Sequence, residues 1–170
     1  EILTKLCTDI DFSADAFPFM SVRAGTVAGI PARVYRISFS GELAYEINVS
    51  ANYGRSLWQA IMTAGQSLNI TPYGTEAMHV LRAEKGYIIV GQDTDGSVTP
   101  GDLGMDWIVS NGKDCIGKRS LSRQDTRREN RKQLVGLTTV DPTLVLPEGA
   151  QLLNEPAKEF PAPMVGHVTS

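Results

Sequence analysis

The sequence predicts an α+β fold, with a mixed part of helices and strands over residues 1–111 and a smaller strand-rich part over residues 112–170. Three observations lead to this prediction. Two runs of alternating apolar residues flank a glycine-containing turn, which is typical of a β-hairpin. Two later segments carry apolar residues at helical spacing. Beyond residue 112, five prolines separate short runs of strand-forming residues.

The chain opens on a helical pattern, because Ile2, Leu3 and Leu6 are at the spacing of one helix face. Farther along, residues 27–31 predict a tight connection. Gly29 supplies the unusual backbone angles that such a connection requires.

A β-hairpin is the firmest local prediction. We expect strands over residues 33–39 and 45–49, joined by a turn at residues 40–42. Because successive side chains of a strand point to opposite faces, Glu46 falls on the face opposite to that of its apolar neighbours. The apolar face of this strand consists of Tyr45, Ile47 and Val49.

Two helices are expected after the hairpin. The first follows Ser50, whose hydroxyl can accept a hydrogen bond from an unpaired backbone N–H. Its apolar stripe runs over residues 57–64, and it ends near Gly65. The second helix starts with Thr75 as a plausible cap, and Gly86 ends it.

A basic segment begins the last part of the chain. Residues 118–132 carry seven Lys and Arg against two acids, with no interleaved aromatic residue. We therefore expect a solvated helix or a subunit contact and not a nucleic-acid surface. Short strands are expected over residues 134–140 and 151–153 and at the final residues.

Composition excludes several classes of function. The net charge is −3 and no apolar run approaches the length of a membrane span, so we expect neither a nucleic-acid nor a membrane partner. The two cysteines and two histidines are isolated, which predicts no metal site and reduced thiols in a cytoplasmic protein. The first residue is Glu1 and the last residues read as a strand, so we expect a fragment.

Six short motifs in order resemble the glycine-cleavage T-protein family of aminomethyltransferases. The hairpin matches its Gly-Glu and Tyr-Glu-Ile strings, and the second helix ends in its Leu-Arg-x-Glu-x-Gly string. Each motif alone is weak, but together they cover nearly the whole chain. The matching residues are 38–47, 81–86, 91–107, 115–118, 131–137 and 165–170.

Within this family, residues 73–87 are most similar to the alpha subunits of heterotetrameric sarcosine oxidases. The resemblance implies α/β layers around a channel that binds tetrahydrofolate, followed by a C-terminal β-barrel. It also implies that a flavin at a subunit interface oxidises sarcosine and that tetrahydrofolate accepts the one-carbon unit as methylene-tetrahydrofolate. The flavin, NAD and the other oxidase subunits are expected outside this chain.

The resemblance implies a folate-binding role for three residues. Glu46 matches a glutamate that binds the pterin ring, and a carboxylate offers two acceptor oxygens to the N–H donors of an aminopyrimidine. Phe39 and Tyr87 match aromatic residues of the pocket and could stack on the folate rings. From the pattern alone, Glu46 is more often a solvent-facing strand residue, and the two aromatics are more often core residues.

No catalytic residue is expected in this chain. In the family, the carboxylate that assists attack at the folate amine lies upstream of the matching segment, and Asp9, Asp11 and Asp15 follow it. The chain alone is therefore expected to have no turnover. Arg82 and Glu84 are expected to form a buried structural pair.

Other functions remain open. Met78 stands where stand-alone T-proteins typically have an arginine that meets the glutamate tail of folate, which speaks against a simple aminomethyltransferase. A dimethylglycine or sarcosine dehydrogenase folate domain is an alternative within the family. A scaffold that has lost folate binding and only holds subunits together is an alternative of another class.

Overall fold

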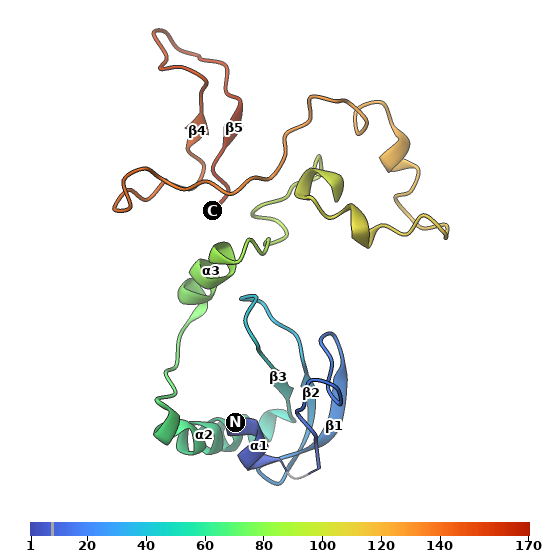
Figure 1. The fold of residues 1–170 in the computed structure, drawn as a ribbon, viewed down its shortest axis with the longest axis vertical. Helices are drawn as coiled ribbons and strands as arrows, with labels where there is room; N and C mark the ends of the chain where they lie inside the picture. Colours follow the sequence, from blue (N-terminus) through green and yellow to red (C-terminus); the bar gives the residue numbers. More distant parts are fainter. Residues whose placement is uncertain (8) are drawn as a thin grey trace. The chain divides into compact units, whose positions relative to one another are not determined.

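The computed structural model describes residues 1–7 and 9–170 and confirms the α+β class (Figure 1). The chain forms two compact units, Glu1–Tyr87 (unit 1) and Ile88–Ser170 (unit 2). The domain division near residue 112 remains a prediction.

Unit 1 is built on a three-stranded antiparallel sheet in the order β1-β2-β3. Strand β1 spans Val22–Val27 and β2 spans Ile30–Tyr35, and the two residues between them form the turn. Ala28 and Gly29 have φ angles of 52° and 74°. Positive φ at both central residues matches the right-handed twist of the two strands, so the predicted tight connection is confirmed.

The predicted β2–β3 hairpin is also confirmed, with shorter strands. Strand β3 spans Glu46–Asn48 and pairs antiparallel with β2. Strand β2 ends at Tyr35, so the prediction of a strand to residue 39 is wrong. Beyond that point the chain leaves the ladder and forms a wide loop, in which Gly41 has a φ of 79°.

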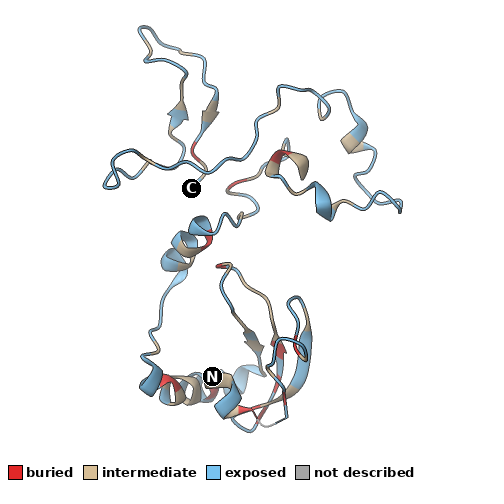
Figure 2. Ribbon diagram, in the orientation of Figure 1, coloured by how far each residue is buried: buried red, intermediate tan, exposed pale blue. Residues whose placement is uncertain are grey.

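The core of unit 1 lies on one face of this sheet. Burial alternates along β2, where Ile30, Ala32 and Val34 are buried and the residues between them are not. Helix α1, Ile2–Leu6, and helix α2, Gly54–Gly65, contact each other and add Leu57 to the core. Figure 2 shows these buried positions in red. An aromatic cluster joins them, with ring centroids 5.3–5.8 Å apart, made by Phe12, Phe17 and Tyr45.

The helix ends differ in detail from those predicted. A 3₁₀ turn, η1 (Ala51–Tyr53), precedes α2, and the Ser50 hydroxyl makes no capping hydrogen bond. Helix α2 ends at Gly65 as predicted and continues into η2, Gln66–Leu68. Helix α3 spans Thr75–Glu84, so Thr75 is its first residue and Gly74 occupies the N-cap. Gly86 follows its end with a φ of 71°, which confirms the predicted stop.

Unit 2 contains mainly turns and short 3₁₀ segments: η3 (Gly101–Leu103), η4 (Asp106–Ile108) and η5 (Ser120–Ser122). Its sheet pairs β4, Gln151–Leu152, with β5, Gly166–His167, where short strands were expected. Residues 134–140 form no strand, so that prediction is wrong. The basic segment 118–132 is not a helix beyond η5, so of its two expected roles the helix is wrong and the subunit contact stays a prediction.

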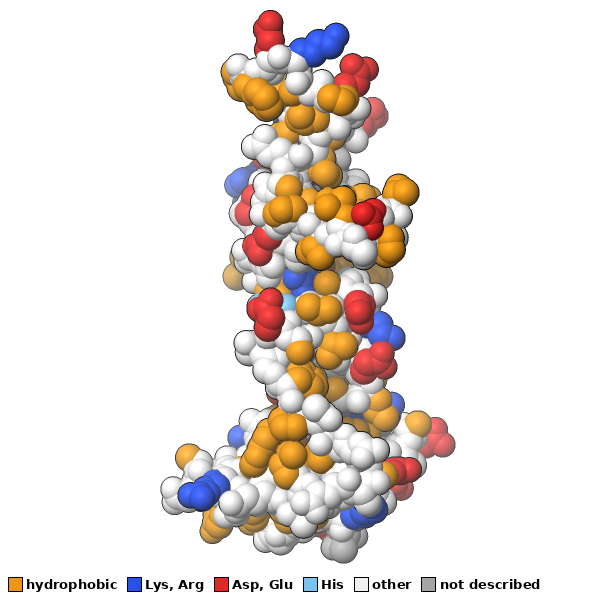
Figure 3. All heavy atoms as spheres, turned by 90° about the vertical axis from the view of Figure 1, so that its left-hand side faces the viewer, with side chains coloured by type: hydrophobic (Ala, Val, Ile, Leu, Met, Phe, Trp, Pro, Cys, Tyr) orange, Lys and Arg blue, Asp and Glu red, His pale blue; other side chains and the backbone are white. Residues whose placement is uncertain are grey.

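Apolar side chains of unit 2 are mostly exposed. Among the buried apolar residues of the described chain, Val168 is the one that lies in unit 2. Figure 3 shows apolar side chains, in orange, spread over the visible face of the chain. Within residues 1–7 and 9–170, no helix has the length and apolar character needed to cross a membrane. Both cysteines are free, with Cys7 buried and Cys115 exposed.

Candidate functional site

Glu46 lies on the outer face of the unit 1 sheet. It is exposed, whereas its strand neighbours Tyr45 and Ile47 pack against the core. Residues directly opposite each other in an antiparallel pair share a face. The register therefore places Tyr35 beside Glu46, and Arg33 beside Asn48, on this same outer face. The predicted separation of Glu46 from the apolar face is confirmed.

The β2–β3 loop touches the end of α3. We call this contact the hairpin–helix junction; it consists of Gly41, Glu42, Lys85 and Tyr87. Nζ of Lys85 lies 2.7 Å from Oε1 of Glu42. This hydrogen bond and ion pair raise the pKa of Lys85, although both side chains are largely exposed. The junction joins two motifs that are about forty residues apart in the sequence.

Gly41 makes this close approach possible. A Cβ at position 41 would lie 2.8 Å from Cβ and Cγ of Lys85 and 3.2 Å from Cε1 of Tyr87. Real Cβ atoms do not approach other carbons to 2.8 Å, and the φ of 79° disfavours any L side chain. A side chain at position 41 would therefore have to displace Lys85 and press on the edge of the Tyr87 ring.

Arg82 fixes the backbone of Tyr87. The Arg82 side chain is 2% exposed, and its Nη1 donates a hydrogen bond of 3.0 Å to the Tyr87 carbonyl. In return, the Tyr87 N–H donates to the Arg82 carbonyl at 2.9 Å. Glu84 is exposed, so the predicted buried pair of Arg82 with Glu84 is wrong. The sequence correctly indicated that Arg82 is buried. It did not indicate that its hydrogen-bond acceptor is the Tyr87 carbonyl, beyond the end of α3.

The three predicted folate-binding residues are brought together only in part. Phe39 and Tyr87 are both half-exposed, at 43% and 41%, and Tyr87 packs beside Gly41, two residues from Phe39. Neither aromatic is a core residue. Within the described residues of unit 1, no ring contact or hydrogen bond joins either of them to Glu46.

The aspartates near the N-terminus have structural partners. Asp9 accepts hydrogen bonds from the N–H of Thr26, at 2.9 Å, and from its hydroxyl, at 3.2 Å. Asp11 accepts from the N–H of Ser13 at 2.8 Å, and this bond lowers the pKa of Asp11. The Asp9 contacts thus join this segment to β1, whereas the Asp11 contact stabilises a local turn.

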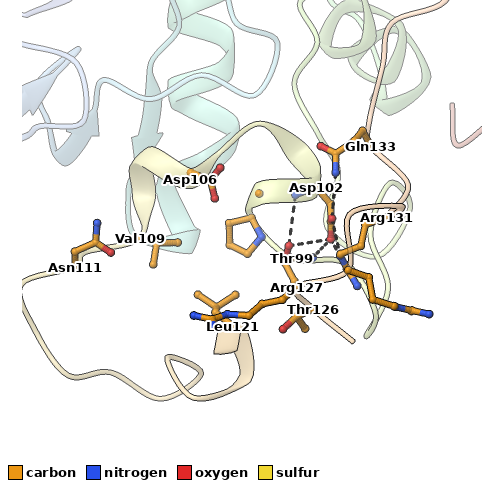
Figure 4. Close-up of a pocket in the computed structure, with 13 residues that line it drawn as sticks. Thr99, Asp102, Asp106, Val109, Asn111, Leu121, Thr126, Arg127, Arg131 and Gln133 are labelled. Carbon is orange, nitrogen blue, oxygen red and sulfur yellow. Dashed lines mark hydrogen bonds and ion pairs between the residues drawn. The ribbon is translucent and has the colours of Figure 1, made fainter. Parts of the chain in front are cut away.

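In unit 2, a buried ion pair joins two further motif segments, and sequence reasoning missed it. Asp102 of η3 pairs with Arg131, whose Nε lies 2.8 Å from Oδ1 of Asp102 (Figure 4). The N–H and hydroxyl of Thr99 also donate to Asp102, at 2.7 and 2.8 Å. The Arg131 hydrogen bond is the largest cause that lowers the pKa of Asp102 to about 2. The signal in the sequence was an Asp just after Thr-Pro and a single Arg just before a β-like run.

Unit 1 thus offers an exposed carboxylate and two half-exposed aromatic rings, a set suited to a flat heterocycle with N–H donors. Among residues 1–7 and 9–170, no group of three or more His, Cys, Asp or Glu side chains has the geometry to hold a metal ion.

Comparisons with known proteins agree with the motif resemblance. The model of the GCVT N-terminal domain family matches residues 1–113. Over the whole chain, 57% of residues are identical to sarcosine oxidase subunit alpha of Corynebacterium sp. (strain P-1), and the match covers 18% of that protein. Dimethylglycine dehydrogenase of Mus musculus is 33% identical over 99% of the chain and 19% of its own length. An aminomethyltransferase of Halothermothrix orenii is 37% identical over 72% of the chain and 34% of its own length. The chain thus spans less than a fifth of the sarcosine oxidase subunit it matches.

Proposed function

The chain belongs to the GCVT N-terminal domain family, and from that premise we propose that it forms part of a tetrahydrofolate site with Glu46 as the pterin-binding residue. The folate would accept the one-carbon unit released from oxidised sarcosine and form methylene-tetrahydrofolate. The high identity to sarcosine oxidase subunit alpha over the whole chain supports this reaction over others of the family.

The outward position of Glu46 carries the proposal. A glutamate in a three-residue strand whose neighbours pack inward is held at a fixed height above the sheet. Its two carboxylate oxygens can accept from the 2-amino group and the adjacent ring N–H of a pterin together. Such paired, charge-assisted bonds orient a flat ring as well as bind it.

Phe39 and Tyr87 supply the aromatic surfaces in this proposal. Both expose about two fifths of their surface, as a ring that stacks on a ligand requires. Tyr87 is held on two sides, by the Arg82 hydrogen bonds and by Gly41. The Tyr87 ring should therefore lose little conformational entropy when a ligand binds.

The remaining chemistry belongs outside this chain in our proposal. The flavin and NAD of the oxidase, and its other subunits, would be held by other parts of the assembly. Asp9 and Asp11 are engaged by Thr26 and Ser13, which supports an upstream catalytic carboxylate and no turnover by this chain alone. Bound tetrahydrofolate would supply the amine nitrogens that take up the one-carbon unit.

We further propose a T-protein-like arrangement around the folate, with residues 112–170 contributing to a C-terminal β-barrel and with a cytoplasmic location. The antiparallel pairing of β4 with β5 supports the barrel, because two distant segments already pair there. The many exposed apolar residues of unit 2 support it as well, since a closed barrel would cover them.

Two alternatives would use the same residues differently. Similarity to an aminomethyltransferase and to a dimethylglycine dehydrogenase favours other one-carbon donors. The half-buried Met78 cannot replace a tail-binding arginine, which counts against the aminomethyltransferase. The exposure of Glu46 is equally compatible with a scaffold that has lost folate binding.

A titration with tetrahydrofolate, monitored by tryptophan fluorescence, tests the proposal. It is carried out on this chain and on a version extended upstream. Glu46→Gln should weaken binding about tenfold, because a charge-assisted pair of hydrogen bonds is lost. Asp15→Asn is the matched control, since Asp15 is an exposed carboxylate of the same unit. Unchanged affinity in a folded Glu46→Gln variant, or no binding by the extended form, would favour the scaffold.

A further inference from the structure

We propose that unit 2 contains a separate binding site for a small oxyanion, a carboxylate or a phosphate group, in a cavity walled by arginines. The cavity has a volume of about 640 Å³ and lies between η3, η4 and the basic segment 118–132 (Figure 4). This volume is in the usual range of small-molecule sites. The inference is independent of the folate proposal, because every residue of the cavity belongs to unit 2.

The lining is polar, which selects a charged ligand. Three arginines and two aspartates line it, and the lining residues include no aromatic side chain. A stacked base or a flat heterocycle would therefore find no ring to contact, whereas an oxyanion would find guanidinium groups. The lining residues used below are Thr99, Asp102, Asp106, Asn111, Thr126, Arg127, Arg128 and Arg131.

One part of the wall is already neutral and rigid. Arg131 is paired with Asp102, and Arg131 Nη1 also donates to the Asp125 carbonyl at 2.9 Å. The Thr99 hydroxyl donates to Asp102, and the Thr126 hydroxyl donates to the Ser120 carbonyl at 2.7 Å. These groups shape the cavity, but their hydrogen-bonding capacity is largely used.

Arg127 and Arg128 carry the charge that remains. Within the described residues of unit 2, Arg127 has no carboxylate partner, and Arg128 donates its Nε to the Asp125 carbonyl at 3.3 Å, which does not neutralise it. The cavity lining thus carries two guanidinium charges without a carboxylate partner, and Asp106 is the carboxylate among the lining residues that has no ion pair within the described part of unit 2. The planar guanidinium of Arg127 can bind two oxygens of a carboxylate or a phosphate, and the Asn111 amide lies in the same wall.

Calorimetric titration of the purified chain with inorganic phosphate and with glutarate, at constant low ionic strength, tests this site. We expect saturable binding of at least one anion. Arg127→Gln should weaken it about tenfold, because a charge-assisted pair of bonds is lost. Tighter binding of phosphate would identify a tetrahedral oxyanion as the ligand group, and tighter binding of glutarate a carboxylate.

Two further variants separate the cavity from general attraction to the basic segment. Arg123→Gln removes an exposed charge of the same segment that does not line the cavity, so the affinity should not change. Asp106→Asn removes the opposing carboxylate and should strengthen binding a few-fold, an effect that misfolding cannot produce. No saturable binding of either anion, or equal weakening by Arg123→Gln and Arg127→Gln, would overturn the proposal.

Discussion

At position 41 a missing side chain decides how two segments of unit 1 meet. The Lys85 side chain and the edge of the Tyr87 ring lie in the space that a Cβ on Gly41 would need. Its positive φ also sets the direction of the β2–β3 loop. One residue therefore determines where the Glu42–Lys85 ion pair forms and how the Tyr87 ring is held.

Gly41→Ala should destabilise the chain by about 2 kcal/mol, since an L residue with positive φ costs roughly 1–2 kcal/mol and the new Cβ must displace Lys85. Urea denaturation followed by circular dichroism measures this loss. Gly54→Ala is the control, because Gly54 has helical angles and nothing within 4 Å of an added Cβ. That change should stabilise by about 0.5 kcal/mol. A loss in Gly54→Ala equal to that in Gly41→Ala would contradict the special role of position 41.

Sequence reasoning predicted the face on which Glu46 lies, because alternation along a strand follows directly from the backbone. It missed the contacts of Arg82. The Tyr87 carbonyl becomes an acceptor only when the chain turns back after α3, and residue order does not show that turn geometry. It also could not place Phe39 and Tyr87 relative to Glu46, since their distances depend on the path of an irregular loop.

At the scale of elements, the Asp102–Arg131 pair holds η3 against the chain that follows the basic segment. The N–H of Leu134 donates to the Asp102 carbonyl at 2.8 Å, beside the ion pair. Arg131 and Asp102 are 14% and 8% exposed, so water screens their attraction only weakly. Because unit 2 has few buried apolar residues, we expect this ion pair to contribute a large part of its stability.

The pair should make stability depend on pH. Its partner holds the pKa of Asp102 at about 2, below the ordinary value of 3.8. A depressed pKa stabilises the folded state above the unfolded value and loses that effect as the pH falls through the folded value. The stability advantage of the wild type over Asp102→Asn should thus shrink by about 2 kcal/mol between pH 5 and pH 2. Urea unfolding at a series of pH values measures it.

Arg131→Met provides the control for this pH effect. Without the guanidinium, the lowering of the Asp102 pKa should largely disappear, and the pH dependence of stability should flatten. A wild type and an Asp102→Asn variant with parallel pH profiles would show that the pair does not contribute in solution.

The elements that sequence patterns predicted well are those with local signals. Three of them lie at glycines: the two-residue turn at Gly29, the end of α2 at Gly65 and the end of α3 at Gly86. Gly29 and Gly86 have positive φ angles, and the end of α2 follows from the length of its apolar stripe. The strand predicted over residues 134–140 failed because a strand needs a partner, and the described chain offers it none. Of the two expectations for the basic segment, the helix did not form, because seven basic residues with one large apolar residue give it no face to pack.

At the scale of the whole molecule, the two units differ in how they are stabilised. Unit 1 has a continuous core on one face of its sheet, with Phe17, Val27 and Val34 fully buried. Unit 2 has Val168 buried and leaves residues such as Trp107, Ile116 and Val140 largely exposed. Burial of apolar surface dominates folding free energy, so unit 1 should be the more stable unit.

The two free cysteines report on the units separately. Cys115 is exposed in unit 2, whereas Cys7 is buried in unit 1, and burial, with a contribution from Asp9, raises its pKa. A thiol reagent should therefore label Cys115 at once and Cys7 at least about a hundredfold more slowly, as unit 1 opens. Labelling of Cys115→Ser in increasing urea should follow the unfolding of unit 1. Equal rates for both thiols in native buffer would contradict the proposed core.

The most direct test of the central claim, that Glu46 binds the pterin edge, is a thermodynamic cycle with a modified ligand. Tetrahydrofolate and its analogue without the 2-amino group are titrated into the wild type and Glu46→Gln. We predict that the wild type prefers tetrahydrofolate about tenfold and that Glu46→Gln loses most of this preference. An equal preference for tetrahydrofolate in both proteins would show that another residue reads the pterin edge, and Glu46 would return to the role of a solvent-facing strand residue.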